Sequence, residues 1–311
     1  MDELTQSLEA FGPWDWACVV VNLLVAIIGI YALKCWRNLP GKSPTPTTMV
    51  SDALIGLCAG LLSFGILFGV VTQLVAQSFS THFGIAQAHL FTAAFCGQLA
   101  AAGAMLGMSG IAPRSLDWAP SVETEEPKSA ASPFRQALAG FSVPRVLLGL
   151  LAIFALGLAA TMAWKGFHVA WEQLFLRGWT GQPPADEPQE IVDAVLKTDV
   201  DTWRFLTIAL AVTIGAPIME ELAFRGMIYP GLRRLGAASD RYGRWLAIIL
   251  TGALFSAAHM SPSAALPLFA FGAFMCLVRD RYGLLTCMAI HCSFNAWNLV
   301  WLKLAPNAST L

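Results

Sequence analysis

The chain has 311 residues, of which 56% are hydrophobic and only 13% are charged. Soluble globular chains carry about one quarter charged residues, so this balance indicates lipid as the main solvent. The formal net charge of −1 leaves no excess of either sign that would attract nucleic acid or a large acidic partner.

Long apolar runs predict the architecture. An α-helix needs about 17–25 mainly apolar residues to cross the hydrocarbon core of a bilayer. The runs that approach this length cover residues 16–36, 50–76, 85–108, 143–165, 203–221, 245–259, 264–278 and 284–302. We therefore predict an all-α fold, a polytopic membrane helix bundle of about eight transmembrane helices. The first run follows an acidic leader without the basic start of a signal peptide, so we expect a retained helix.

The polar stretches between these runs divide the chain. Residues 109–142 hold four prolines among Ser, Ala and Glu, which is typical of a flexible linker. We therefore predict an N-terminal module of three transmembrane helices plus the linker over residues 1–135, and a core over residues 136–311. Within the core, the apolar side chains of residues 188–201 recur at helical spacing, which predicts a short amphipathic surface helix.

The basic residues indicate the orientation in the membrane. They gather in the loops after the first, fifth and seventh predicted spans, whereas the segment before the first span is acidic. By the positive-inside rule these loops face the cytoplasm, so both termini are predicted to be non-cytoplasmic. We expect a multi-pass membrane protein, in the plasma (inner) membrane of a bacterium or in an endomembrane of a eukaryote.

Ionisable side chains in the predicted spans gather between residues 220 and 295. Each costs a few kcal/mol to insert and therefore indicates function. Glu221 and Arg225 are spaced i, i+4 and can form an ion pair, whereas the neighbouring Glu220 points about 100° away around the helix. This division indicates Glu220 as a general base and the other two residues as its support. A helix end that meets lipid headgroups would show the same residues.

Further polar groups follow on later spans. His259 stands alone on an apolar helix, where a hydrogen-bonded core histidine is the commoner occurrence. His291 and Asn295 are spaced i, i+4, so both could donate hydrogen bonds to one oxyanion. With Glu220 they could converge on a water and a carbonyl, the carboxylate taking the proton of the water. Glu220, His259 and His291 could instead hold a zinc ion, although no two of them show the HExxH spacing.

Three motifs within residues 203–300 resemble a known family. EELAFR, FSAAH and HCSFN match, in this order, the EExxxR, FxxxH and HxxxN motifs of the CAAX protease and bacteriocin-processing (CPBP) family. That family is related to the type II CAAX prenyl endopeptidase, the Ras-converting enzyme. The resemblance implies a helical intramembrane endopeptidase that hydrolyses a peptide bond near the C-terminus of a membrane-associated substrate.

The resemblance also implies roles for the candidate residues. Glu220 and His259 would activate water, His291 and Asn295 would stabilise the oxyanion, and Glu221 with Arg225 would support the site. We favour a glutamate mechanism that requires no cofactor, with a zinc ion as the alternative. The expected partners are the lipid bilayer and a peptide or lipidated protein that enters from the cytoplasmic side or from the bilayer; nucleic acid is not expected.

Two other functions stay open on the sequence alone. The chain could be a non-catalytic relative, a membrane binding or bacteriocin-immunity-type protein in which the same polar cluster grips a partner. It could also be a transporter that uses the two adjacent glutamates as a proton relay, although the chain shows no internal repeat of the kind that many transporters have.

One feature of the predicted spans conflicts with the motifs. If the sixth span starts at Trp245, His259 lies roughly 20 Å along it, because a helix rises 1.5 Å per residue. Glu220 lies near the end of the fifth span, at the opposite depth, so the two side chains would not meet. Span boundaries are the least reliable part of such a prediction, and we therefore give the motifs precedence.

Overall fold

The computed structural model describes residues 12–38, 141–171, 202–235, 240–261 and 264–305, with short helical pieces at 74, 77, 96–98 and 101–102. Every regular element among these residues is a helix, which confirms the all-α prediction for this part of the chain. The predicted spans 50–76 and 85–108, the linker, and the amphipathic segment 188–201 lie almost wholly outside the described residues.

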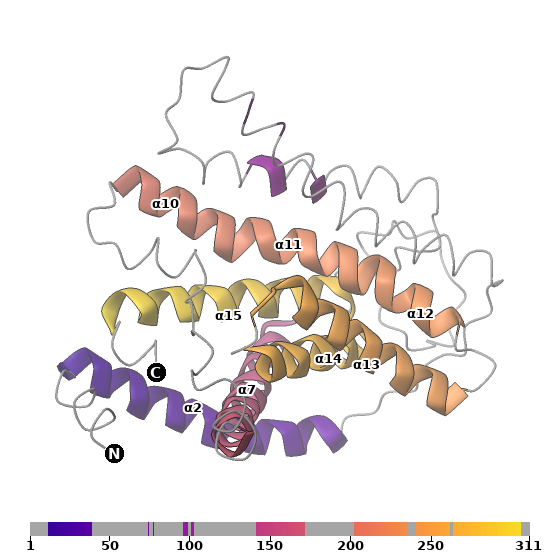
Figure 1. Cartoon of the computed structure of the whole chain (residues 1–311), viewed down its shortest axis with the longest axis horizontal. Coiled ribbons are helices and arrows are strands. Elements are labelled where there is room, and N and C mark those ends of the chain that lie inside the picture. The colour runs from indigo at the N-terminus through magenta and orange to yellow at the C-terminus, as the bar shows by residue number, and fades with distance from the viewer. Residues whose placement is uncertain are drawn as a thin grey trace.

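Ten helical segments are found among the described residues. They are α2 (Pro13–Asn38), α7 (Val143–Trp171), α10 (Thr202–Leu210), η4 (Ala211–Gly215), α11 (Ala216–Glu221), η5 (Leu222–Ile228), α12 (Tyr229–Leu235), α13 (Asp240–Ala258), α14 (Ala265–Tyr282) and α15 (Leu284–Leu304). In Figure 1 the run from α10 to α12 and the N-terminal α2 lie on opposite sides of α14 and α15.

Three stretches of the described residues are long and apolar enough to cross a membrane. They are Pro13–Ile30, Val143–Phe167 and Phe205–Arg233, and Tyr242–Ala258 is a shorter apolar helix. This finding supports a membrane protein, while the total of about eight spans stays a prediction.

The helix that carries the glutamates is longer than predicted. The run from α10 through η4, α11 and η5 to α12 is continuous from Thr202 to Leu235 (Figure 1), whereas the apolar pattern predicted an end at residue 221. The boundary was wrong because Glu221 and Arg225 were taken to mark a polar helix end. Both side chains are fully buried, and residues Leu222–Ile228 are all buried as well. Glu220 therefore lies in the middle of a helix, which removes the conflict in depth with His259.

A second boundary was also too short. α14 continues to Tyr282, so Arg279 and Asp280 belong to the helix and are buried rather than exposed in a basic loop. The helix ends at Gly283, whose φ of 83° lies in the left-handed region that favours glycine. This glycine reverses the chain into α15 without an intervening loop.

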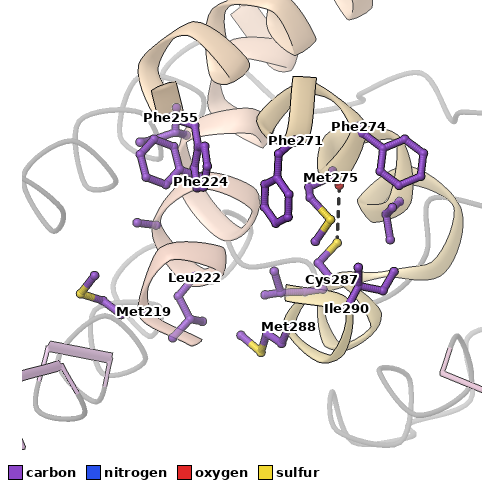
Figure 2. Close-up of a cluster of buried hydrophobic side chains, with 14 of the residues drawn as sticks. Met219, Leu222, Phe224, Phe255, Phe271, Phe274, Met275, Cys287, Met288 and Ile290 are labelled. Carbon is purple, nitrogen blue, oxygen red and sulfur yellow. Dashed lines mark hydrogen bonds between the residues drawn. The ribbon is translucent and has the colours of Figure 1, made fainter. Parts of the chain in front are cut away.

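The run from α10 to α12 (Thr202–Leu235) is called the long helix below. The apolar core lies between the long helix, α13, α14 and α15 (Figure 2). Phe224 meets Phe255 of α13 edge to face, with ring centroids 5.2 Å apart, and Phe255 stacks on Phe271 of α14 at 5.6 Å. Cys287 of α15 donates to the backbone carbonyl of Met275 at 3.5 Å, as the dashed line in Figure 2 shows. These contacts hold together the helices that carry the candidate residues.

Two glycines let α13 and α14 approach closely. A Cβ atom at Gly272 would lie 3.0 Å from the Cα of Gly252 and 3.0 Å from the Cβ of Phe255. A Cβ atom at Gly252 would lie 3.0 Å from the carbonyl oxygen of Phe269. Small residues at a helix crossing let two backbones pack face to face inside a membrane.

We expect Gly272→Ala to destabilise the protein, because the new methyl would push α13 away from α14. Overpacking of this kind costs about 1–3 kcal/mol in the free energy of unfolding. Gly157→Ala on α7 is the matched control, since a Cβ there meets nothing within 4 Å. It should leave the thermal unfolding temperature in detergent unchanged or raise it slightly. Equal unfolding temperatures for the two variants would contradict a tight crossing at Gly272.

The N-terminal helix α2 packs on the same bundle. Its Gly29 lies against the backbone of Leu151 in α7, where a Cβ atom would overlap the carbonyl oxygen. The indole Nε1 of Trp297 on α15 donates to Asn22 Oδ1 on α2 at 2.9 Å. The division of the chain after residue 135 stays a prediction, but this polar contact joins α2 to the helix of His291 and Asn295.

A double-mutant cycle of Asn22→Ala and Trp297→Phe should show a favourable coupling between the two helices. Hydrogen bonds between membrane helices couple by about 0.6 kcal/mol on average, because the bond is made in a medium without water. The free energy of unfolding in mixed micelles measures it for both single variants and the double variant. Additive single effects would mean that the bond does not contribute.

Candidate active site

A buried ion pair lies at the centre of the candidate site. Arg225 Nη1 donates to Glu221 Oε1 at 3.0 Å, and both side chains are 0% exposed. Arg225 also donates through Nη2 to the carbonyl oxygen of Gly272 at 3.1 Å. Its guanidinium carbon lies 4.6 Å from the ring centroid of Phe255, in cation–π distance. The predicted i, i+4 pair is therefore present, and it ties the long helix to α13 and α14.

The same carboxylate fixes the orientation of His291. His291 Nδ1 lies 2.8 Å from Glu221 Oε1, and both groups are buried. An ionised carboxylate only accepts hydrogen bonds, so Nδ1 carries the proton and donates it to Glu221. When the ring is neutral, the lone pair of His291 therefore lies on Nε2. Phe271 packs against this ring with centroids 4.8 Å apart and limits its rotation.

His259 adopts the same tautomer through a different partner. Its Nδ1 lies 2.8 Å from the carbonyl oxygen of Phe255, one turn earlier in the chain. A carbonyl oxygen is an acceptor, so Nδ1 donates and the lone pair of the neutral ring lies on Nε2. The motif FSAAH thus supplies both the imidazole and the backbone oxygen that orients it.

Glu220 lies between the two imidazoles. Its Oε2 is 4.0 Å from His259 Nε2 and 3.9 Å from His291 Nε2. This oxygen is buried and has no hydrogen-bond partner among the described residues. Three acceptor atoms, one carboxylate oxygen and two ring nitrogens, therefore face one another from three different segments. Such a group needs a donor or a cation between its members, because buried polar atoms without partners are costly.

Two kinds of occupant suit these three atoms, a water or a divalent metal ion. Two ligands about 2.1 Å from a tetrahedral zinc ion lie about 3.4 Å apart. Two acceptors that share the hydrogens of one water, each about 2.8 Å from its oxygen, lie about 4.4 Å apart. The separations of 3.9 and 4.0 Å lie between these two values, so the spacing is compatible with both occupants. Among the described residues, no group of three His, Cys, Asp or Glu side chains has the arrangement of a metal site.

Asn295 lies one turn beyond His291 on α15. Its Nδ2 donates to the carbonyl oxygen of Val212 at 2.9 Å, in the π-helical segment η4 of the long helix. A carboxamide has two N–H donors, so the second stays available for another acceptor. Single π-helical turns are frequent at functional sites, and here η4 and η5 lie on either side of the turn that carries Glu220.

The structure brings Glu220 within 4.0 Å of His259 and His291, and it bonds Glu221 to His291 and Arg225. Asn295 lies one turn beyond His291, and the catalytic roles of these residues stay predictions. Glu220, Glu221 and Arg225 come from the long helix, His259 follows α13, and His291 and Asn295 come from α15. Sequence reasoning missed two participants. Phe255 had a signal, since it opens the motif FSAAH, whereas the Val212 carbonyl had none, because any residue supplies one.

The fold and this cluster define a helical membrane protein with a buried carboxylate–imidazole site. Residues 202–297 match the family described as type II CAAX prenyl endopeptidase Rce1-like. This match over the last third of the chain supports the relationship that the three motifs predicted. No curated protein and no solved structure matches the chain.

The two adjacent glutamates should respond differently to neutralisation. Glu221→Gln leaves the fully buried Arg225 without a counter-charge, and breaking a buried pair costs about 3–5 kcal/mol in the free energy of unfolding. Glu220→Gln removes a charge whose Oε2 has no partner, so stability should change by less than about 1 kcal/mol. Thermal unfolding of the two variants in the same detergent measures the difference. The reverse order would contradict the assignment of Glu221 as the structural carboxylate.

Proposed function

We propose that the protein is an intramembrane endopeptidase that hydrolyses a peptide bond with a water held by Glu220 and His259. The observation that carries the proposal is the meeting of Glu220 Oε2, His259 Nε2 and His291 Nε2 around one buried position, with separations of 3.9 and 4.0 Å. A water there would donate its two hydrogens to acceptors, which leaves a lone pair of its oxygen free to attack a carbonyl carbon.

One proton moves in this step, and it passes from the water to Glu220 and then to the substrate. As the water oxygen bonds to the carbonyl carbon, one water proton passes to Glu220. The tetrahedral intermediate then breaks at the C–N bond, and the proton on Glu220 passes to the leaving amine. His259 keeps the water oriented, because its Nδ1 is committed to the Phe255 carbonyl and its Nε2 can only accept.

The oxyanion of the intermediate would be stabilised by α15. Asn295 offers its second N–H, since the first is bonded to Val212. His291 can donate from Nε2 only as an imidazolium, because Nδ1–H is bonded to Glu221. This role requires one proton in addition to the one taken from the water, and that proton stays on His291 throughout the step. The Glu221 carboxylate lies 2.8 Å away and stabilises that positive charge. Preorganised donors of this kind act most strongly in a site that excludes water.

The substrate class and the cofactor requirement are the finer part of the proposal. The Rce1-like match over residues 202–297 supports a CAAX-type substrate, a peptide or lipidated protein cut near its C-terminus. We propose that no metal takes part, because a water can bridge Glu220 and His259 and the described residues hold no group of three ligands with the arrangement of a metal site. A divalent ion would be held by Glu220, His259 and His291 and would polarise the bound water.

Purified protein in detergent should cleave a C-terminal CAAX-type peptide, prenylated or unprenylated. Glu220→Gln should lower kcat by about 10²–10⁴-fold, the usual contribution of a general base. Asn295→Ala should lower it by about 10²–10³-fold, as expected for one oxyanion donor. Ser293→Ala is the matched control on the same helix, since among the described residues its hydroxyl bonds to the backbone of Ala289 alone. Cleavage is measured by mass spectrometry of the products.

Three results would overturn the proposal or part of it. Undiminished cleavage by Glu220→Gln would remove the general base and with it the mechanism. Loss of cleavage on chelation, with recovery on added zinc, would replace the metal-independent route by a metal-assisted one. Absence of cleavage of either peptide by the folded wild type would favour the non-catalytic binding protein.

A further inference from the structure

A second buried cluster lies at the opposite end of the helices that carry the site. Asp280 of α14 is 4% exposed and accepts three hydrogen bonds. Tyr229 Oη donates to Oδ2 at 2.9 Å, Arg233 Nη1 donates to Oδ1 at 2.7 Å, and Arg244 Nε donates to Oδ2 at 2.9 Å. The donors come from α12 and α13, so one carboxylate joins three helices.

The cluster lies at the closed end of a helical hairpin. The chain runs from Glu220 to Arg233 in one direction and returns along α13 from Arg244 to His259. With 13 and 15 residue steps at 1.5 Å each, Glu220 and His259 both lie about 20 Å from the arginines. Asp280 therefore bonds to both helices at one end of the hairpin, and the site residues lie at the other end.

At the site end of the hairpin, Glu220 on the long helix faces His259 after α13. No direct hydrogen bond joins them, because Glu220 Oε2 and His259 Nε2 are both acceptors and lie 4.0 Å apart. The neighbouring contacts are the edge-to-face rings of Phe224 and Phe255 and the guanidinium of Arg225 over Phe255. Such ring contacts contribute about 0.5–1.5 kcal/mol each. Charge-assisted hydrogen bonds from both arms are found at the other end of the hairpin, where Arg233 and Arg244 both donate to Asp280.

The positive charges around Asp280 require a carboxylate at this position. Arg233 and Arg244 carry the same charge and bond to the two oxygens of one carboxylate. Arg279 precedes Asp280 and is itself buried, Arg281 follows it, and Arg145 of α7 lies over the Tyr282 ring at 5.3 Å. Without the carboxylate, two partly desolvated guanidinium groups would repel each other, and α12 and α13 would separate at this end.

We propose that Asp280 is a positioning residue for the site: its carboxylate fixes α12 and α13 to α14 and thereby sets the approach of His259 to Glu220. The effect on catalysis rests on the proposed peptidase function, but the effect on helix spacing does not. A displacement of about 1 Å between reacting groups can cost about 10²-fold in rate, so a loose hairpin would lower kcat while the substrate still binds.

The test combines kinetics with a distance measurement on the full chain. Asp280→Asn should lower kcat at least tenfold with KM within about twofold, because the geometry of the reacting groups changes and the binding surface does not. Asp280→Glu, which keeps the carboxylate, should recover part of the activity. Tyr229→Phe, which removes one bond and no charge, should give a smaller change in the same direction and guards against a variant that fails to fold.

Spin labels on two exposed residues, Ile214 of η4 and Met260 just after α13, report the spacing at the site end without reference to activity. Asp280→Asn should broaden or shift their distance distribution. Asp15→Asn is the matched control, because Asp15 is also buried but bonds to the backbone of Gly12 beside α2. An unchanged distribution in Asp280→Asn, or an equal change in Asp15→Asn, would overturn the proposal.

The two readouts separate this proposal from the proposed function. An inactive wild type would count against the peptidase, and the distance distributions would still decide whether Asp280 sets the spacing. An active wild type with unchanged kcat in Asp280→Asn would overturn the positioning role while leaving the peptidase intact.

Discussion

A carboxylate and a guanidinium that are both fully buried must neutralise each other, and the pair of Glu221 and Arg225 does so inside a helix that is long and apolar enough to span a membrane. The remaining donors and acceptors of this pair are used to build the site. Glu221 orients His291, and Arg225 bonds to the Gly272 carbonyl and lies over Phe255. One ion pair on the long helix thus contacts α13, α14 and α15 at once.

This arrangement depends on how closely the backbones approach. Arg225 reaches the Gly272 carbonyl because α13 and α14 cross at Gly252 and Gly272, where a side chain would not fit. At the end of the same helices that is far from the site, the buried Asp280 accepts three hydrogen bonds and joins them. The two polar clusters lie on one helix pair, about two turns of α14 apart, and between them Met275, Cys276 and Val278 are fully buried. Polar bonds set the register, and apolar packing fills the space between them.

The sequence predicted the residues of the site better than the limits of its helices. Glu220, His259 and His291 converge as the three motifs indicated, because side-chain chemistry at helical spacing is visible in a single chain. The end of the span at residue 221 was wrong, since the charges of Glu221 and Arg225 were taken for a membrane boundary. For the same reason the end of the predicted span at residue 278 was wrong, and it left Asp280 in a basic loop. A pattern of single residues cannot distinguish a charge that is paired across helices from one in water, and it carries no information on a backbone acceptor such as the Val212 carbonyl.

The charge balance of the site links its structure to its chemistry. With neutral imidazoles, Glu220, Glu221 and Arg225 sum to one net negative charge in an environment where an uncompensated charge is expensive. One additional proton shared among Glu220, His259 and His291 brings the sum to zero. The peptidase cycle proposed here moves one proton from water to Glu220 and on to the leaving amine, so it passes through states that differ by the position of one proton and not by net charge. A site that is closest to neutral when it holds one mobile proton is suited to hydrolysis without any change in the charge that the membrane has to accommodate.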